Sequence, residues 1–108
     1  MSPSPANLLA ALPERLAQEQ FDVLLRRPGV RLERIVSTGQ ATPPGEWLSQ
    51  ADAEWVLLLK GAAGLAFENE AEIRLSPGDC LLIPADCRHR VNWTAQGEAT
   101  VWLALHLA

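Results

Sequence analysis

Short runs in which apolar and polar positions alternate cover most of the chain after residue 20. Examples are "VRLERIVS" (30–37), "HRVNWT" (89–94) and "ATVWLALHL" (99–107), and Gly, Pro or Asp lies within three residues of the start of each. A period of two over four to eight residues is typical of a half-buried strand. The pattern predicts strands at 21–25, 30–37, 54–61, 65–67, 71–75, 79–84, 89–94 and 99–107.

These strands recur at short intervals, with turn residues between them and without intervening long helical patterns. Parallel sheets need long crossover connections, which are missing from this sequence. Repeated short strands with turn signals predict an antiparallel sandwich or barrel. The sequence therefore predicts an all-β fold. A length of 108 residues suits one domain, and we assign residues 21–108 to it.

The first twenty residues have a different pattern. Asn7 precedes "LLAALPERLAQEQ" and is a good helix N-cap, while Pro13 is expected to divide the segment into two short helices. Residues 1–20 are therefore predicted to be a helical lead-in. They contain neither a basic start nor a long apolar run, so we predict no secretory signal and a cytoplasmic protein.

Charge and composition exclude several kinds of partner. The net charge is −4, from 9 basic and 13 acidic residues, and this argues against nucleic acid. No apolar run approaches the length that crosses a membrane. The two cysteines, Cys80 and Cys87, lack metal-type spacing and are predicted to be reduced. Cys80 suits a buried strand position, whereas Cys87 is either structural or, beside Arg88, a reactive thiol.

Two spaced motifs are specific. The first reads Glu54-x6-Gly61, and the second reads Gly78-x5-Pro-x-Asp86-x2-His89. Together they resemble the two-part signature of the cupin superfamily, G-x5-H-x-H-x3,4-E-x6-G and G-x5-P-x-G-x2-H-x3-N. The resemblance extends from about residue 30 to the C-terminus. It is closest to small bacterial cupins that carry "PPGEWYDQ" and "PAHCRHRV", where this chain has "PPGEWLSQ" and "PADCRHRV".

The resemblance implies a jelly-roll β-barrel whose pocket holds a divalent metal, Fe, Mn, Ni or Zn, on histidine and glutamate ligands. The two histidines of the first motif are absent. Their places fall at Leu48 and Gln50, or at Trp47 and Ser49 with the longer spacing. If a metal binds, the candidate ligands are Glu54, His89, His106 and Gln50.

Several assignments around this site remain open. If Trp102, Ala104 and His106 face the barrel interior, His106 joins Glu54 at the pocket; if the leucines between them do, His106 lies on the surface. Glu54 either serves the site or pairs with an arginine such as Arg88 or Arg90. Further pocket candidates are Trp47, Trp93, Trp102 and Asp86. The tryptophans more often fill a core than line a pocket, and Asp86 could add an oxygen ligand.

His89 begins a predicted strand in which residues 89, 91 and 93 share one face. Val91 and Trp93 are apolar, while Arg90 and Asn92 on the other face are polar. We therefore predict that His89, Val91 and Trp93 point into the barrel. A histidine at the open end of an apolar face is the setting of a ligand pocket.

Two functions follow from the pattern and the resemblance. The first is a small-molecule-binding cupin, whose activity, if it has one, is metal-dependent and resembles that of oxygenase or isomerase cupins. The alternative is a degenerate, non-catalytic cupin that senses a ligand or forms a structural dimer. Small cupins commonly pair, so we expect a homodimer whose interface uses the strand "FDVLL" and tryptophan-bearing faces.

Overall fold

The computed structural model describes residues 2–108 and contains eight strands. Their positions match the predicted runs closely, and they confirm the all-β, antiparallel jelly-roll architecture. The strands are β1 (Gln20–Arg27), β2 (Val30–Ser37), β3 (Ala53–Lys60), β4 (Ala63–Phe67), β5 (Ile73–Leu75), β6 (Cys80–Ile83), β7 (His89–Thr94) and β8 (Thr100–Leu107).

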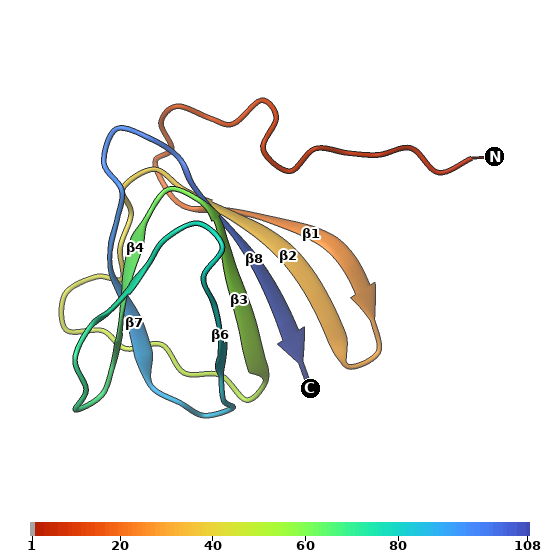
Figure 1. Cartoon of the computed structure of the whole chain (residues 1–108). Coiled ribbons are helices and arrows are strands. Elements are labelled where there is room, and N and C mark those ends of the chain that lie inside the picture. Colours follow the sequence, from red (N-terminus) through yellow and green to blue (C-terminus); the bar gives the residue numbers. More distant parts are fainter. Residues whose placement is uncertain (1) are drawn as a thin grey trace.

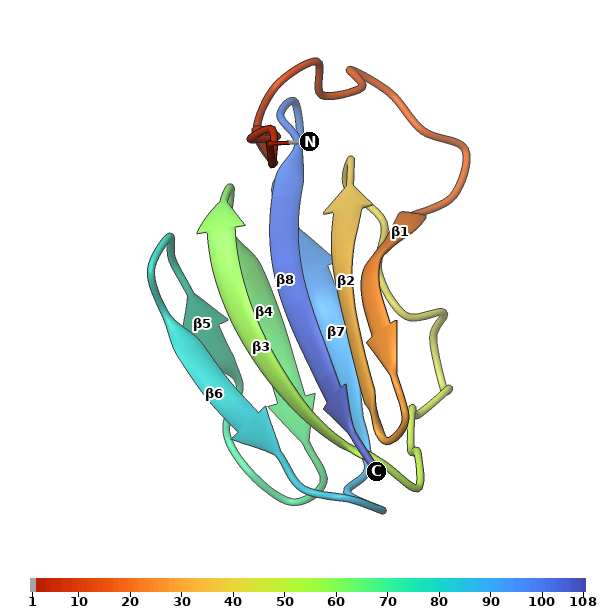
Figure 2. The same ribbon diagram turned by 90° about the vertical axis from the view of Figure 1, so that its right-hand side faces the viewer.

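The strands form two sheets that face each other (Figures 1 and 2). The large sheet has the order β1-β2-β8-β3-β6, and the small sheet has the order β5-β4-β7. Every pairing is antiparallel. The last strand, β8, lies in the middle of the large sheet between β2 and β3, so residues from the two ends of the chain meet there.

The core lies between the two sheets and is built from one face of each strand. On β8 the inward residues are Trp102, Ala104 and His106, which are buried, while the leucines between them are half-buried. On β3 the inward residues include Glu54 and Val56. The inward face of the large sheet is therefore apolar near its middle and carries ionisable groups toward the C-terminal end of β8.

The predicted N-terminal helices are wrong, because residues 2–108 contain no helix. Asn7 does cap a turn, since its side chain accepts a hydrogen bond from the Leu9 N–H at 2.8 Å. The turn stops at Ala11, which adopts a positive φ of 51°, and Pro13 has no N–H to continue it. No helix in the described part of the chain is long and apolar enough to cross a membrane.

The loop between β2 and β3, residues 38–52, lies along the free edge of β7. Leu48 and His89 exchange two backbone hydrogen bonds, at 2.7 and 3.0 Å, in an isolated antiparallel bridge. Arg90 fastens the same loop, because its guanidinium donates to the carbonyls of Thr42, Pro43 and Glu46 at 2.9, 3.3 and 3.1 Å. These bonds fix the loop side chains over the space between the sheets.

Strand β7 contains a bulge that changes which way its residues face. Val91 pairs with Leu65 and Trp93 pairs with Gly64, so Asn92 is the extra residue. The prediction that Trp93 shares the inward face with His89 and Val91 is therefore wrong, because strict alternation ends at the bulge. The Trp93 indole lies outside, where it donates to Glu72 at 3.1 Å.

Candidate functional site

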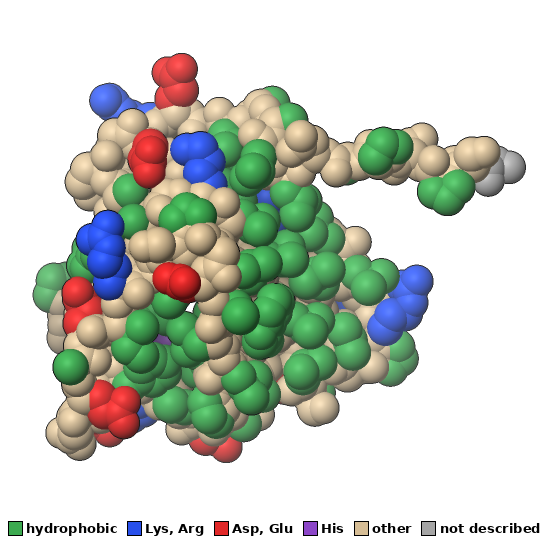
Figure 3. All heavy atoms as spheres, viewed as in Figure 1, with side chains coloured by type: hydrophobic (Ala, Val, Ile, Leu, Met, Phe, Trp, Pro, Cys, Tyr) green, Lys and Arg blue, Asp and Glu red, His purple; other side chains and the backbone are tan. Residues whose placement is uncertain are grey.

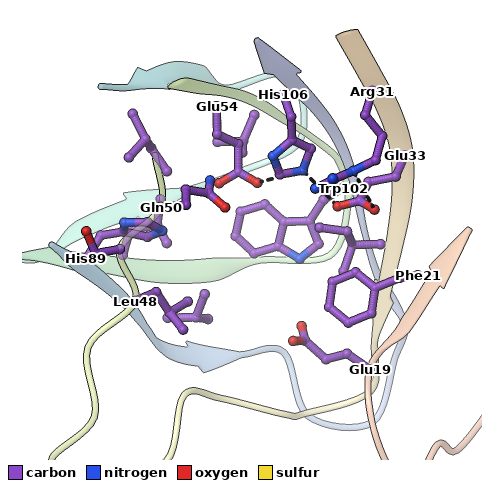
Figure 4. A pocket seen from close by; sticks show the side chains of 16 residues that line it. Glu19, Phe21, Arg31, Glu33, Leu48, Gln50, Glu54, His89, Trp102 and His106 are labelled. Carbon is purple, nitrogen blue, oxygen red and sulfur yellow. Dashed lines mark hydrogen bonds and ion pairs between the residues drawn. The ribbon is translucent and has the colours of Figure 1, made fainter. Parts of the chain in front are cut away.

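A cavity of about 420 Å³ opens between the two sheets and combines apolar walls with an acidic corner (Figure 4). Strands β2, β3, β7 and β8 and the loop 38–52 contribute most of its lining. The apolar part comprises Phe21, Ile35, Leu48, Val56, Leu65, Ile83, Val91 and Trp102. The polar part comprises Glu19, Arg31, Glu33, Ser49, Gln50, Glu54, His89 and His106.

The acidic corner is centred on His106. Its Nε2 lies 2.8 Å from a Glu33 oxygen and 3.4 Å from a Glu54 oxygen. The sheet register explains this arrangement. Strand β3 pairs Glu54 with His106, while β2 places Glu33 opposite Ala104, two residues from His106 and next to it on the same face of β8. His106 therefore faces the cavity, and its Nε2 must carry the proton because both of its neighbours are carboxylates.

Glu33 and Arg31 were not predicted as site residues. Both face inward from β2, and the Arg31 Nε lies 3.7 Å from a Glu33 oxygen. Their signal was present in the sequence as two charged residues on one face of a strand. The strand order was needed to recognise it, because only the placement of β2 beside β8 brings Glu33 to His106.

His89 lies at the other end of the polar lining and is fixed in orientation. Its Nδ1 is 2.9 Å from the carbonyl of Cys87, so Nδ1 carries a proton and donates it. In the neutral ring this leaves Nε2 as a hydrogen-bond acceptor. In Figure 4 the Gln50 side chain lies between His89 and Glu54.

Two buried ring nitrogens around the cavity have no hydrogen-bond partner among residues 2–108. They are Nε1 of Trp102 and Nδ1 of His106, whose residues are both only 4% exposed. In addition, no side chain in the described part of the chain makes a geometrically complete hydrogen bond to the Glu54 carboxylate, although Glu54 is only 9% exposed. Buried polar groups are normally satisfied by protein or by ordered water, so these groups have hydrogen-bonding capacity open to a water molecule or a ligand.

The other predicted pocket residues do not line this cavity. The Trp47 ring lies under the Arg88 guanidinium, whose Cζ is 5.5 Å from the ring centroid. Asp86 adopts a positive φ of 58° in the turn before β7, and its N–H donates to the Gln50 carbonyl at 2.8 Å. Left-handed backbone favours Gly and tolerates Asp, so Asp86 can occupy this turn.

The arginines considered as partners of Glu54 are engaged elsewhere. Arg88 pairs with Glu68 at 2.6 Å, and Arg90 holds the loop 38–52.

Both cysteines are free. Cys80 is exposed, contrary to its prediction as a buried residue, because it sits on the edge strand β6 with its partner Leu57 facing outward. Cys87 packs against the core.

Outside the cavity, on the outer side of the small sheet, Glu72 has a pKa below its ordinary value. The main cause is the hydrogen bond that Asn92 donates to it, and the Trp93 indole adds a second. These bonds favour the ionised carboxylate and hold the Trp93 indole beside Gly64, where a Cβ would come within 2.2 Å of the indole nitrogen.

Comparison with known proteins agrees with this geometry. The family model for the cupin domain matches residues 34–106. The chain belongs to the cupin family. No curated protein sequence matches it significantly.

Among solved structures, this cupin is similar to a protein from Ralstonia eutropha JMP134 that is described as a proposed mannose-6-phosphate isomerase. The two are 48% identical with a TM-score of 0.94, over 97% of this chain and 98% of that one. A cupin superfamily protein from Desulfitobacterium hafniense DCB-2 is 21% identical, with a TM-score of 0.77 over 99% and 94% of the two chains. A protein of unknown function from Streptococcus pyogenes is 18% identical, with a TM-score of 0.76 over 99% and 89%. The last two show the fold alone.

Cupins commonly hold a divalent metal. All four candidate ligands line the cavity. However, residues 2–108 contain no group of three or more His, Cys, Asp or Glu arranged to hold a metal ion. His106 uses its Nε2 on Glu33, and Leu48 occupies one place of the missing histidine pair. As arranged in residues 2–108, these side chains do not form a group that fits a divalent metal, and metal binding by Glu54, His89, His106 and Gln50 stays a prediction.

Proposed function

We propose that this cupin binds a small organic ligand in the cavity between its sheets. The observation that carries the proposal is the set of buried polar groups that lack partners at the cavity wall, Trp102 Nε1 above all. Cavities of 300–1,000 Å³ with apolar walls and few polar groups are typical of small-molecule sites, and this one, at about 420 Å³, lies within that range.

The charge of the cavity restricts the ligand. Three carboxylates, Glu19, Glu33 and Glu54, face one guanidinium, Arg31. A phosphate would bring further negative charge next to these carboxylates, and repulsion between like charges is strong where water is excluded. We therefore expect a neutral or cationic ligand, and weak binding of mannose 6-phosphate, the compound suggested by the description of the Ralstonia eutropha relative.

The experiment follows the indole N–H signals in ¹H–¹⁵N NMR spectra. The probes are 4-methyl-1-pentanol, a neutral apolar alcohol, and mannose 6-phosphate. We expect the alcohol to shift the Trp102 signal and leave that of Trp93, outside the barrel, unchanged. Val91→Phe should fill part of the cavity and weaken binding, whereas Asn92→Phe at the exposed neighbouring position should not. An alcohol-induced shift that survives in Val91→Phe would contradict the proposal.

The alternative function, a structural dimer, is supported by the outer face of the large sheet. One row of directly paired side chains crosses all five strands and is entirely apolar: Leu25, Leu32, Leu105, Trp55 and Leu82. Figure 3 shows hydrophobic side chains gathered over much of this sheet. Exposed apolar patches of this kind mark interaction sites, and a flat face without a dominant charge suits a second copy of the same chain.

We therefore propose a homodimer in which two large sheets pack face to face. Leu82 is 56% exposed and Leu25 is 41% exposed, so both have surface left to bury. In light scattering at micromolar concentration, Leu82→Lys combined with Leu105→Lys should convert the dimer to a monomer. Leu9→Lys, on the N-terminal segment, is the control and should remain dimeric. A wild-type protein that is monomeric throughout would contradict this proposal.

The location of the protein is also part of the proposal. Cys80 and Cys87 are both free. Unpaired cysteines are usual in reducing compartments, which supports a cytoplasmic protein.

A further inference from the structure

We propose that the ligand of the cavity is a small, mostly apolar amino alcohol, or a close chemical equivalent, with its ammonium group at Glu54 and its oxygen at Trp102. This inference rests on the proposed ligand-binding function and adds the chemical class. It follows from three separate observations: the unsatisfied carboxylate, the unsatisfied indole N–H and the apolar wall.

The Glu54 carboxylate needs hydrogen-bond donors. An ionised carboxylate can accept about four hydrogen bonds. The only ion-pair neighbour of Glu54 in the described part of the chain is His106, at 3.4 Å, and the single Nε2 proton of His106 is directed to Glu33 at 2.8 Å. An ammonium group offers three donors and no acceptor, which matches a carboxylate that lacks donors.

The balance of charge favours a cation over a neutral donor. Arg31 is the one guanidinium at the cavity, and it lies beside Glu33 rather than Glu54. Glu19, at the other side, accepts a hydrogen bond from the Ser37 hydroxyl, which brings no charge. A cationic group at Glu54 would therefore offset a surplus of negative charge that the protein leaves uncompensated.

The Trp102 indole N–H needs a hydrogen-bond acceptor rather than a donor. Its Nε1–H is a donor only, it is buried, and no acceptor among residues 2–108 reaches it. In Figure 4 the indole ring lies across the cavity below His106. An ammonium group cannot satisfy it, whereas an acceptor oxygen at a second position of the ligand can, once the indole or the protein atoms that cover Nε1 shift.

The rest of the wall is hydrophobic and describes the body of the ligand. Ile35, Val56, Leu65 and Val91 line the rest of the cavity, and none of them offers a hydrogen bond through its side chain. A polyhydroxylated molecule would leave its own hydroxyls unpaired against these residues, at a cost. A branched aliphatic body avoids that cost.

The test compares four matched probes. Leucinol has an amine, a hydroxyl and an isobutyl body. Removing the amine gives 4-methyl-1-pentanol, removing the hydroxyl gives 4-methylpentan-2-amine, and 4-methylpentanoate carries a carboxylate instead. Affinity is measured by isothermal titration calorimetry at neutral pH. A charge-assisted hydrogen bond exceeds a neutral one by an amount equivalent to about tenfold in affinity, so leucinol should bind about tenfold tighter than the alcohol. The carboxylate should bind most weakly.

Two variants assign each end of the ligand. Glu54→Gln should remove the preference for leucinol over 4-methyl-1-pentanol and leave the affinity of the alcohol within about twofold, while the exposed Glu70→Gln changes neither. Trp102→Phe should remove the preference for leucinol over 4-methylpentan-2-amine. The second variant keeps the test valid if Glu54→Gln fails to fold.

The outcomes distinguish a failure of the amino-alcohol class from a failure of ligand binding itself. If all four probes bind equally and shift the Trp102 signal, the cavity binds ligands and the amino-alcohol class is wrong. Tighter binding of 4-methylpentanoate than of leucinol also overturns it. If no probe binds and no indole signal moves, the ligand-binding function itself is wrong.

Discussion

Gly61, the last residue of the first cupin motif, gives a sharp test of why that motif requires glycine. It follows β3 with a φ of +87°, and a Cβ built on it would lie 2.4 Å from the Thr100 Oγ1 and 2.7 Å from the Thr100 Cα. Gly78, which opens the second motif, has a similar φ of +96° but no atom within 4 Å of its Cβ position. Both glycines have a left-handed backbone conformation, but only Gly61 lacks space for a Cβ.

The expected cost of alanine at each site follows from this difference. A left-handed backbone costs a non-glycine residue about 1–2 kcal/mol. Overpacking against atoms that cannot move aside adds about 1–3 kcal/mol, and the Thr100 Cα is such an atom because β8 is held on both sides. Gly61→Ala should therefore lower the free energy of unfolding by about 2–5 kcal/mol, and Gly78→Ala by about 1–2 kcal/mol.

Urea denaturation of both variants and the wild type, at one fixed protein concentration, measures the difference. Equal concentrations are needed because a dimer gains apparent stability as its concentration rises. If Gly61→Ala and Gly78→Ala are equally destabilised, the close approach of Thr100 does not explain the first-motif glycine, and the backbone conformation alone does.

Three further predictions concern the loop, the β1–β2 pair and metal. Arg90→Met should lower the free energy of unfolding by about 2 kcal/mol and speed limited proteolysis within residues 38–52, because three loop carbonyls lose a charged donor; an unchanged cleavage pattern would argue against the clamp. The pKa of Asp22 is lowered from its ordinary value of 3.8, first by the hydrogen bond from the Gln20 amide and then by that from Arg34. The ionised carboxylate therefore stabilises the fold above pH 3.8, and this stabilisation is lost as the pH falls through the lowered pKa. Asp22→Asn should therefore cost about 0.5 kcal/mol in thermal or urea unfolding at pH 7 and nothing in strong acid, whereas a cost that grows on acidification would be the wrong sign. Elemental analysis of the purified protein should find well under one metal ion per chain; a full equivalent that disappears in His89→Ala would reverse our conclusion on metal fit.

The strands were predictable because each is a short apolar run between strong turn signals. Residues 30–37 and 89–94 were placed with the same bounds that the structure gives. The N-terminal segment was not, since the periodicity of "LLAALPERL" suits a helix while Ala11 and Pro13 end it after one turn. Local turn geometry overrode the propensity of the apolar residues.

The site was predictable where a motif or a strand pairing specified it. Glu54 and His89 came from the motif spacing, and the pairing of β3 with β8 brings His106 directly opposite Glu54. Glu33 was missed because its neighbour is distant in sequence and depends on β2 lying against β8. Trp93 was misplaced because a single extra residue in a strand leaves no trace in a hydrophobic pattern.

That extra residue also affects how sequences of this kind should be aligned. Residues 89–91 and 93–94 of β7 belong to two separate registers, joined at Asn92. A homologue that lacked one residue here would keep its Trp93 equivalent outside the barrel and its Thr94 equivalent inside, because removal of Asn92 restores regular alternation after Val91. An alignment gap in this strand therefore belongs at Asn92, where it removes the bulge without changing which side chains face the cavity. A gap one position away would pair inward residues with outward ones.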